Sequence, residues 1–322
     1  MKKKINVFII GAGRIAGLNE LDKLRLKPAS HVGAYMNNSI YNICGVYDKD
    51  KISGKKFSKL FKIKYYHNLQ KGLLEADPNH ISIAVPYKEN LNIIEIVLKF
   101  TKNLKSILCE KPISNSIKSA LKIHYLCEKN KVKLFVNNRR LMTHHQEIKK
   151  IIKNKFNGHI IEMNACCSSG LHAIGTHMIE LIFDICGDPE WVIGCKVKNN
   201  IKKLPYSMNY HKNDPTVFSI SKFQNEIKVF FSNTAETLYS MFEFKIILKD
   251  GIIESKDNLS KIIYRKYIKP KRSTLSYKLS SPVVHNYKEI PLFKIISDHI
   301  LSNYKNNFKN YNHSPLNSIM QS

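Results

Sequence analysis

The chain begins with a mostly apolar run, Ile5–Ile10, that stops at the turn formed by residues 11–17. An apolar run followed by Gly-x-Gly is typical of a buried parallel strand that leads into a phosphate-binding turn. Gly11, Gly13 and Ala16 occupy the small-residue positions of such a turn, and the first N–H groups of the following helix bind anions. The turn therefore predicts a dinucleotide site, with a purely structural strand-to-helix turn as the alternative. The residues expected to contact the cofactor here are Gly11, Gly13, Arg14 and Ile15.

A second informative segment follows the run Ser106–Leu108 and reads Cys109-Glu110-Lys111-Pro112. The carboxyl ends of parallel strands meet at one edge of a sheet, so Lys111 is expected beside the cofactor. A partly desolvated lysine can exchange a proton with a bound substrate, and Glu110 can accept hydrogen bonds from backbone or ribose groups. The alternative for Lys111 is a surface lysine, since the chain contains 52 lysine and arginine residues.

Asp48 indicates which nicotinamide nucleotide the site prefers. It follows the strand-like run Ile43–Tyr47, and a carboxylate at this position accepts hydrogen bonds from the ribose hydroxyls and repels a 2′-phosphate. NAD is therefore the expected cofactor. Lys49 and Lys51 follow closely and keep NADP as an alternative.

Two further segments concern the same site. Asp48 lies 35 positions after Gly13, whereas the usual span is about 20, so residues 18–35 are predicted to contain an insertion before or within the first helix. Pro86 and Tyr87 end a third strand-like run, at the edge where the nicotinamide half of the cofactor is expected. Both residues are candidate cofactor contacts, and an ordinary solvent-facing turn is the alternative.

Strand-like and helix-like segments alternate up to about residue 138, which predicts an α/β domain with a Rossmann doubly wound parallel sheet, covered on both faces. The expected strands are Ile5–Ile10, Ile43–Tyr47, His80–Val85, Ser106–Cys109 and Lys133–Val136. The expected helices include Lys56–Phe61, Leu91–Phe100 and Ser116–Lys129.

Short strand-like runs dominate after about residue 158, which predicts an α+β domain built on an open, largely antiparallel sheet. These runs are His159–Ala165, Trp191–Val197, Thr216–Lys222, Glu226–Ser232, Phe242–Leu248 and Ile252–Glu254. Thr176–Cys186 and Leu292–Lys305 have the length of helices, and the second can pack back on the first domain. The basic segment Lys256–Lys288 is expected to be a loop or an irregular extension. The predicted domains are 1–138 and 139–322.

Composition limits the classes of function. The net charge is 52 − 25 = +27, but the lysines are dispersed along the whole chain, so no specific nucleic-acid partner is expected. The seven cysteines are scattered and form no C-x-x-C pair, which disfavours a disulfide framework or a zinc site, and no metal is expected. The chain has no apolar run of about 18 residues, so no membrane span is expected. Together these features favour a reducing, cytoplasmic location.

The motifs, in this order, resemble the Gfo/Idh/MocA family of sugar-related oxidoreductases. The matching segments are residues 11–17, Asp48, Val85-Pro86-Tyr87, Glu110-Lys111-Pro112, Asn138-Arg139-Arg140, residues 175–180 and residues 239–251. The resemblance implies a Rossmann domain, NAD(P)-dependent chemistry at a carbohydrate hydroxyl, and a second domain whose open sheet often makes the oligomer interface. A homodimer or homotetramer is expected on that ground. Residues 30–35 resemble a version of the first helix that follows a longer loop in some members.

The chain departs from the family pattern at Ala173. Members commonly read Asp-Ile-Gly-x-His, whereas this chain reads Ala173-Ile174-Gly175-Thr176-His177. Side chains at i and i+4 of a helix face each other, so the missing carboxylate would have oriented the imidazole of His177.

The neighbours of His177 offer only partial substitutes for that carboxylate. His172 lies one residue before Ala173, about 100° around a helix, and is no simple replacement. Glu180 can supply a partner from the other side. The alternative for both histidines is a helix-packing role.

The resemblance implies an NAD(P)-dependent oxidoreductase that acts on a CH–OH group of a sugar, nucleotide sugar or related polyol. Lys111 and His177 are the candidate catalytic residues, and His172 is a candidate substrate contact. Arg139 can hold a substrate carboxylate or phosphate, because a guanidinium does so in a bidentate manner. The alternative is a catalytically silent dinucleotide-binding sensor of the same fold, which Ala173 favours.

Overall fold

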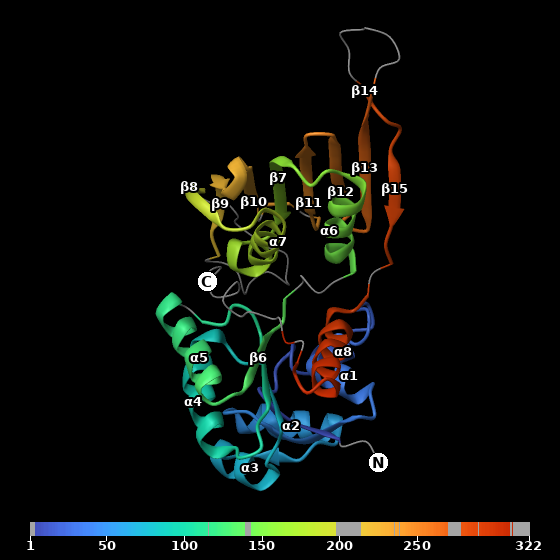
Figure 1. Ribbon diagram of the computed structural model, residues 1–322. Coiled ribbons are helices and arrows are strands. Elements are labelled where there is room, and N and C mark those ends of the chain that lie inside the picture. The colour runs from blue at the N-terminus through green and yellow to red at the C-terminus, as the bar shows by residue number, and fades with distance from the viewer. Residues whose placement is uncertain are drawn as a thin grey trace. The chain divides into compact units, whose positions relative to one another are not determined.

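The computed structural model describes residues 4–114, 116–138, 143–197, 214–234, 236–237, 239–269, 278–288, 290–309 and 311. The chain divides into two compact units (Figure 1). The first comprises residues 1–138 and 290–322, and the second comprises residues 139–289.

The first unit is built on a six-stranded sheet with the order β3-β2-β1-β4-β5-β6. All five strand pairs are parallel, and this order is that of doubly wound dinucleotide-binding folds. The strands are β1 (Ile5–Ile10), β2 (Tyr41–Tyr47), β3 (Tyr65–Tyr66), β4 (His80–Ile83), β5 (Ser106–Cys109) and β6 (Lys133–Val136). The predicted Rossmann sheet is confirmed.

Helices cover both faces of this sheet, which explains why its central strands are buried throughout. One face packs against α3 (Leu69–Ala76), α4 (Asn90–Phe100) and α5 (Ile117–Lys129). The other packs against α1 (His31–Met36), α2 (Lys51–Phe61) and α8 (Leu292–Lys305). Four of these helices begin at a side-chain cap, as the sequence favours. The capping residues are Ser30, Asp50, Asn68 and Ser116.

The second unit is built on a nine-stranded mixed sheet with the order β14-β13-β12-β11-β7-β10-β9-β8, and β15 pairs with β13. The pair β7–β10 is parallel, and the other pairs are antiparallel. The strands are β7 (Ile160–Ser168), β8 (Pro189–Val197), β9 (Thr216–Phe223), β10 (Lys228–Thr234), β11 (Phe242–Leu248), β12 (Gly251–Lys256), β13 (Lys261–Ile268), β14 (Lys278–Leu279) and β15 (Val283–Asn286).

One face of this sheet packs against α6 (Thr143–Lys155) and α7 (Thr176–Cys186), which lie on the same side of the strands (Figure 1). The alternation in β11 shows how the sequence specifies this. Phe242, Phe244 and Ile246 are buried toward the helices, whereas Lys245 is exposed. His145 of α6 is also fully buried, close to the ring of Phe242. The predicted open, largely antiparallel sheet is confirmed.

The expectation of an irregular segment at Lys256–Lys288 is wrong for its described part. Residues 261–268 form β13, which pairs with β12 and β15. Ile262 and Tyr264 of β13 are buried, and the charged residues around them lie at exposed or half-buried positions. Because strands on an open sheet expose one face, the lysines between the apolar residues are compatible with a strand.

The last described helix, α8, belongs to the first unit although it follows the second in sequence. Leu301 of α8 packs among the residues of α1, α2 and the sheet. The hydroxyl of Tyr41 donates a hydrogen bond to the carbonyl oxygen of Ser297 at 2.6 Å. Across the described ranges, no helix combines the length and apolarity needed to cross a membrane.

Candidate active site

The loop after β1 is held between the ends of its two neighbouring strands. The N–H of Gly11 donates to the carbonyl oxygen of Tyr47 at 2.8 Å, and the N–H of Ala84 donates to that of Ile10 at 2.8 Å. Gly11 has φ +109°, and a Cβ there would lie 2.4 Å from the carbonyl oxygen of Ala84. The backbone path of this turn therefore requires glycine at position 11.

Gly13 has different surroundings, because a Cβ built on it meets nothing within 4 Å. Its φ does not lie in the left-handed region either. The fold itself therefore does not require glycine at position 13. The N–H groups of residues 13–16 donate to no acceptor among the described residues. Open space beside unpaired N–H groups fits the close approach of a pyrophosphate, so the residues present fit a dinucleotide.

The insertion in residues 18–35 lies within the first helix rather than before it. A helical turn begins directly after the loop, since the N–H of Gly17 bonds to the carbonyl oxygen of Gly13. The N–H of His31 at the start of α1 then bonds to the carbonyl oxygen of Ile15 at 3.2 Å, and that of Val32 bonds to Ala16 at 2.9 Å. The short α1 therefore continues the first turn through backbone hydrogen bonds, and residues 17–30 form an excursion between the two parts.

Two charged side chains order this excursion. The ammonium of Lys27 donates to the carbonyl oxygens of Asn19, Glu20 and Asp22 at 2.7–2.9 Å. The Glu20 carboxylate accepts from the N–H of Ala29 and the hydroxyl of Ser30 at 2.6 and 2.8 Å. The excursion thus returns the chain to α1 in a defined position, which places His31 inside the unit.

Asp48 contacts the loop that the sequence pairs with it. Its Oδ2 accepts the N–H of Ala12 at 2.7 Å, and its Oδ1 accepts the N–H of Asp50 at 2.8 Å. Each carboxylate oxygen has a second lone pair, so both oxygens can still accept from ribose hydroxyls. Asp48 therefore braces the phosphate loop in addition to the role expected from the sequence.

The other candidate cofactor contacts lie along the same edge of the sheet. Pro86 and Tyr87 follow β4 and are exposed, and Tyr87 begins a short 3-10 turn. Arg14 is exposed and its Nε donates to the Asn19 side chain at 3.4 Å, whereas Ile15 is half-buried.

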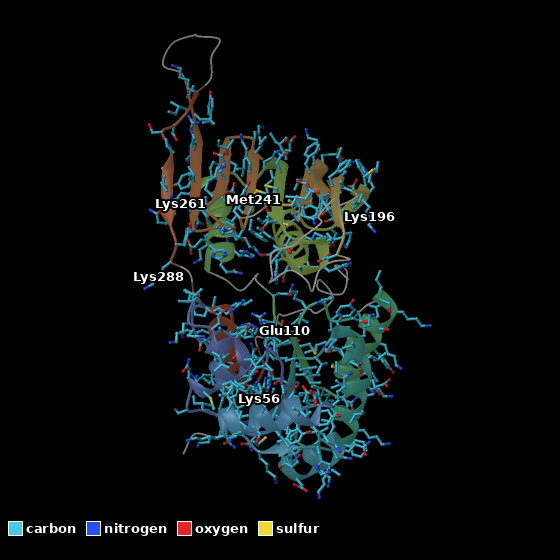
Figure 2. The ribbon with its side chains drawn as sticks, turned by 180° about the vertical axis from the view of Figure 1, so that it is seen from behind. Lys56, Glu110, Lys196, Met241, Lys261 and Lys288 are labelled. Carbon is cyan, nitrogen blue, oxygen red and sulfur yellow. The ribbon has the colours of Figure 1, made fainter. Side chains whose placement is uncertain are left out.

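Glu110 follows β5 at this edge, where its N–H bonds to the carbonyl oxygen of Ile83 at 3.3 Å. Its side chain is 17% exposed, and Figure 2 marks it in the first unit. Oε1 accepts from Nε2 of His31 at 2.8 Å and from the Asn137 amide at 2.7 Å. Lys111 is half-buried directly after it. His31 and Asn137 were not predicted as site residues, because their partner Glu110 is distant in the chain.

The residues predicted from the second unit lie around the start of α7. Residues 171–175 form a π-helical turn before it, on which His172 is exposed and Ala173 is buried. His177 and Glu180 are buried in α7. The Asp214 carboxylate accepts from the N–H of His172 at 2.7 Å and from the N–H of Ala173 at 2.8 Å.

A carboxylate is therefore present at the turn where Ala173 lacks one, supplied by a residue just before β9. A Cβ at position 170 would clash with this carboxylate, so the absence of a side chain on Gly170 makes room for Asp214. Asp214 was not predicted as a site residue, since nothing in the sequence links position 214 to position 173.

The structure brings one group of predicted residues together within the first unit. Gly11, Asp48, Pro86 and Glu110 follow adjacent strands at one sheet edge. His172 and His177 belong to the second unit, the first exposed on the turn before α7 and the second buried in α7. Arg139 lies outside the described residues. In the described ranges, no cluster of three or more His, Cys, Asp or Glu side chains is arranged to hold a metal ion.

A doubly wound sheet with an open glycine loop and an acidic residue after the second strand is typical of nicotinamide-dinucleotide-binding proteins. Residues 5–138 match the family model Gfo/Idh/MocA, described as an oxidoreductase family with an NAD-binding Rossmann fold. The first unit is therefore similar to the NAD-binding domain of this family, which confirms the resemblance that the sequence motifs suggested. No curated protein sequence matches the chain.

Solved structures extend the likeness to the whole fold. An oxidoreductase from Agrobacterium radiobacter, in complex with NAD+, L-tartaric acid and magnesium, has a TM-score of 0.74 at 15% identity and covers 99% of this chain and 93% of its own. An oxidoreductase from Thermotoga maritima has a TM-score of 0.74 at 17% identity, covering 99% and 94%. UDP-N-acetylglucosamine 3-dehydrogenase from Acidithiobacillus ferrooxidans has a TM-score of 0.71 at 12% identity, covering 94% and 90%.

Proposed function

We propose that this protein is an NAD-dependent oxidoreductase that acts on a carbon bearing a hydroxyl or ketone in a sugar, a nucleotide sugar or a related polyol. The observation that carries the proposal is the position of Glu110 and Lys111. They follow β5 on the sheet edge that also holds the open loop at Gly13. A nicotinamide ring supplies hydride transfer when bound, and this edge is where doubly wound folds bind it.

In the proposed reaction, Lys111 binds the substrate oxygen and handles its proton. For oxidation, the hydride leaves the carbon for the nicotinamide while the hydroxyl proton passes to the neutral amine of Lys111, alone or through His177. Reduction reverses both transfers. Positioning a proton acceptor in this way typically contributes a factor of about 10²–10⁴ to the rate.

NAD is the proposed cofactor rather than NADP, because the Asp48 carboxylate lies beside the loop and repels a 2′-phosphate. The sugar-type substrate is supported by a structural neighbour, which is named as a dehydrogenase of UDP-N-acetylglucosamine. We further propose His172 and Arg139 as substrate contacts, and a homodimer or homotetramer as the assembly.

The test is a fluorescence titration of the full chain with NADH and NADPH, followed by turnover assays on a panel of sugars and nucleotide sugars. NADH should bind more tightly than NADPH. Lys111→Met should keep NADH binding within about twofold and lose at least about a hundredfold of turnover. A wild-type protein that binds neither nucleotide would refute the proposal.

A second candidate is a dinucleotide-binding sensor without a redox cycle, and one observation favours it. Ala173 is buried where the family pattern has an aspartate, so position 173 supplies no carboxylate. Tight NADH binding without turnover on the whole panel would support the sensor and exclude the enzyme.

A further inference from the structure

The strands β4 and β5 bury polar side chains on the face that packs against α1 and α8. His80, Ser82 and Ser106 are fully buried, whereas Ile81 and Ile83 occupy the alternate positions of β4 and join the opposite core. Buried polar side chains are costly unless each has a hydrogen-bond partner. A layer of them inside a parallel sheet therefore requires a specific arrangement.

His31 connects this buried layer to Glu110 at the sheet edge. Its side chain is fully buried, and its Nε2 lies 2.8 Å from Oε1 of Glu110. A carboxylate offers no hydrogen, so Nε2 must carry the hydrogen of this bond. Nδ1 lies 2.8 Å from Oγ of Ser82, whose hydroxyl can then donate to it. Both ring nitrogens are thus engaged, which fixes the orientation of the imidazole.

The layer continues from Ser82 toward the amino-terminal ends of β4 and β5, where His80 and Ser106 lie. The hydroxyl of Tyr35 donates to Oγ of Ser82 at 3.2 Å and lies 3.0 Å from Nε2 of His80. Nδ1 of His80 lies 2.7 Å from Oγ of Ser106, which in turn lies 2.9 Å from the hydroxyl of Tyr304 in α8. His31 is therefore the end of a hydrogen-bonded chain that is anchored in α1, β4, β5 and α8.

The two oxygens of Glu110 have different surroundings. Oε1 accepts from both His31 and Asn137. In the described part of the chain, no donor contacts Oε2, and this atom is not buried. One oxygen is thus committed to the protein and the other is available to a donor from a ligand, such as a ribose hydroxyl or a carboxamide.

We propose that His31 is a positioning residue of the dinucleotide site, which holds Glu110 by Oε1 so that Oε2 and the adjacent Lys111 are presented to the bound nucleotide. The inference rests on the proposed function and names a residue that acts through Glu110 rather than on the ligand. A carboxylate held in advance loses less freedom when the ligand binds, which increases affinity.

The experiment is a double-mutant cycle on NADH binding, measured by fluorescence titration of the full chain. Glu110→Gln should weaken binding about tenfold, since a hydrogen bond to a charged acceptor is lost. His31→Asn cannot reach Glu110 and should weaken binding by a similar factor. The double variant should bind no more weakly than Glu110→Gln, because His31 acts only through that carboxylate. His31→Gln carries an amide nitrogen near the place of Nε2 and should restore most of the affinity.

Tyr41→Phe is the matched control, because it also removes a buried hydrogen bond between α8 and the sheet but lies outside the hydrogen-bonded chain that contains His31. It should lower the melting temperature and leave the Kd for NADH within about twofold. If the effects of His31→Asn and Glu110→Gln multiply, or if Tyr41→Phe weakens binding as much as His31→Asn, the positioning role is wrong while the proposed function stands. A wild-type chain that binds no NADH would overturn both.

Discussion

Gly11 and Gly13 lie two residues apart in the loop after β1, but different constraints act on them. At Gly11 the positive φ and the nearby carbonyl of Ala84 exclude any side chain. At Gly13 the protein leaves open space, so an added methyl group would contact only a bound ligand. Glycine is therefore required at position 11 by the fold and at position 13 only by the proposed ligand.

Alanine substitutions at these two glycines should have opposite effects. Gly11→Ala should lower the free energy of unfolding by about 2 kcal/mol or more, through strain and the clash with a backbone oxygen. Gly13→Ala should leave stability unchanged or raise it by about 0.5 kcal/mol, while the Kd for NADH rises about tenfold. Chemical denaturation and NADH titration measure the two effects. Equal NADH affinity of Gly13→Ala and wild type would mean that no phosphate approaches this loop.

The site residues that could be predicted from the sequence are those that directly follow a strand. Gly11, Asp48 and Glu110 each follow a strand that was predicted, and parallel strands bring these ends to one edge. His31 was not predicted as a site residue, because its contact with Glu110 spans 79 positions and depends on the excursion before α1. The polar residues His80 and Ser82 inside an otherwise apolar strand were the one available indication of the buried layer.

At the scale of elements, strands rich in apolar residues were predicted more accurately than a strand in which charged residues alternate with apolar ones. The bounds of β1, β5 and β6 agree with the prediction, since these runs are mostly apolar and end at a glycine or a polar turn. The strand β13 was missed, because its buried residues alternate with charged ones and the segment reads as basic. The strand β11 also exposes one face, but its bounds agree with the prediction because apolar residues dominate its segment. Alternation is therefore a weaker signal where charged residues dominate.

The exposed face of the second sheet supports the proposed oligomer and allows a test. Phe218 and Ile220 of β9 are 50% and 44% exposed, and they pair in register with Cys195 and Ile193 of β8. A contiguous apolar patch of this kind is typical of an interface. Phe218→Glu should shift the protein to monomers in sedimentation velocity, whereas Tyr125→Glu, at an exposed aromatic of α5, should not. An unchanged mass for Phe218→Glu would exclude this face as the interface.

For the whole molecule, the first unit is completed by a helix that follows the second unit in sequence. Phe293 packs its ring against His31, and Tyr304 ends the buried hydrogen-bonded chain. The polar layer between α8 and the sheet is thus formed from segments at both ends of the described chain. Its stability depends on the protonation of the groups it buries, above all the imidazole of His80.

Burial, with a smaller contribution from His31, lowers the pKa of His80 to about 3. In the unfolded chain His80 takes up a proton near pH 6.5, whereas the folded protein resists that proton until about pH 3. The unfolded state therefore binds more protons between these values, and the free energy of unfolding falls as the pH decreases. The slope from this one residue is about 1.4 kcal/mol per pH unit, or on the order of 5 kcal/mol over the whole range.

Denaturant unfolding of wild type and His80→Asn from pH 7 to pH 4 measures this pH dependence. His80→Asn should be less stable than wild type at pH 7 and should lose less stability on acidification, so that the two curves converge. The control His67→Asn, at an exposed histidine, should follow wild type. Parallel curves for His80→Asn and wild type would show that His80 is not buried as a neutral imidazole.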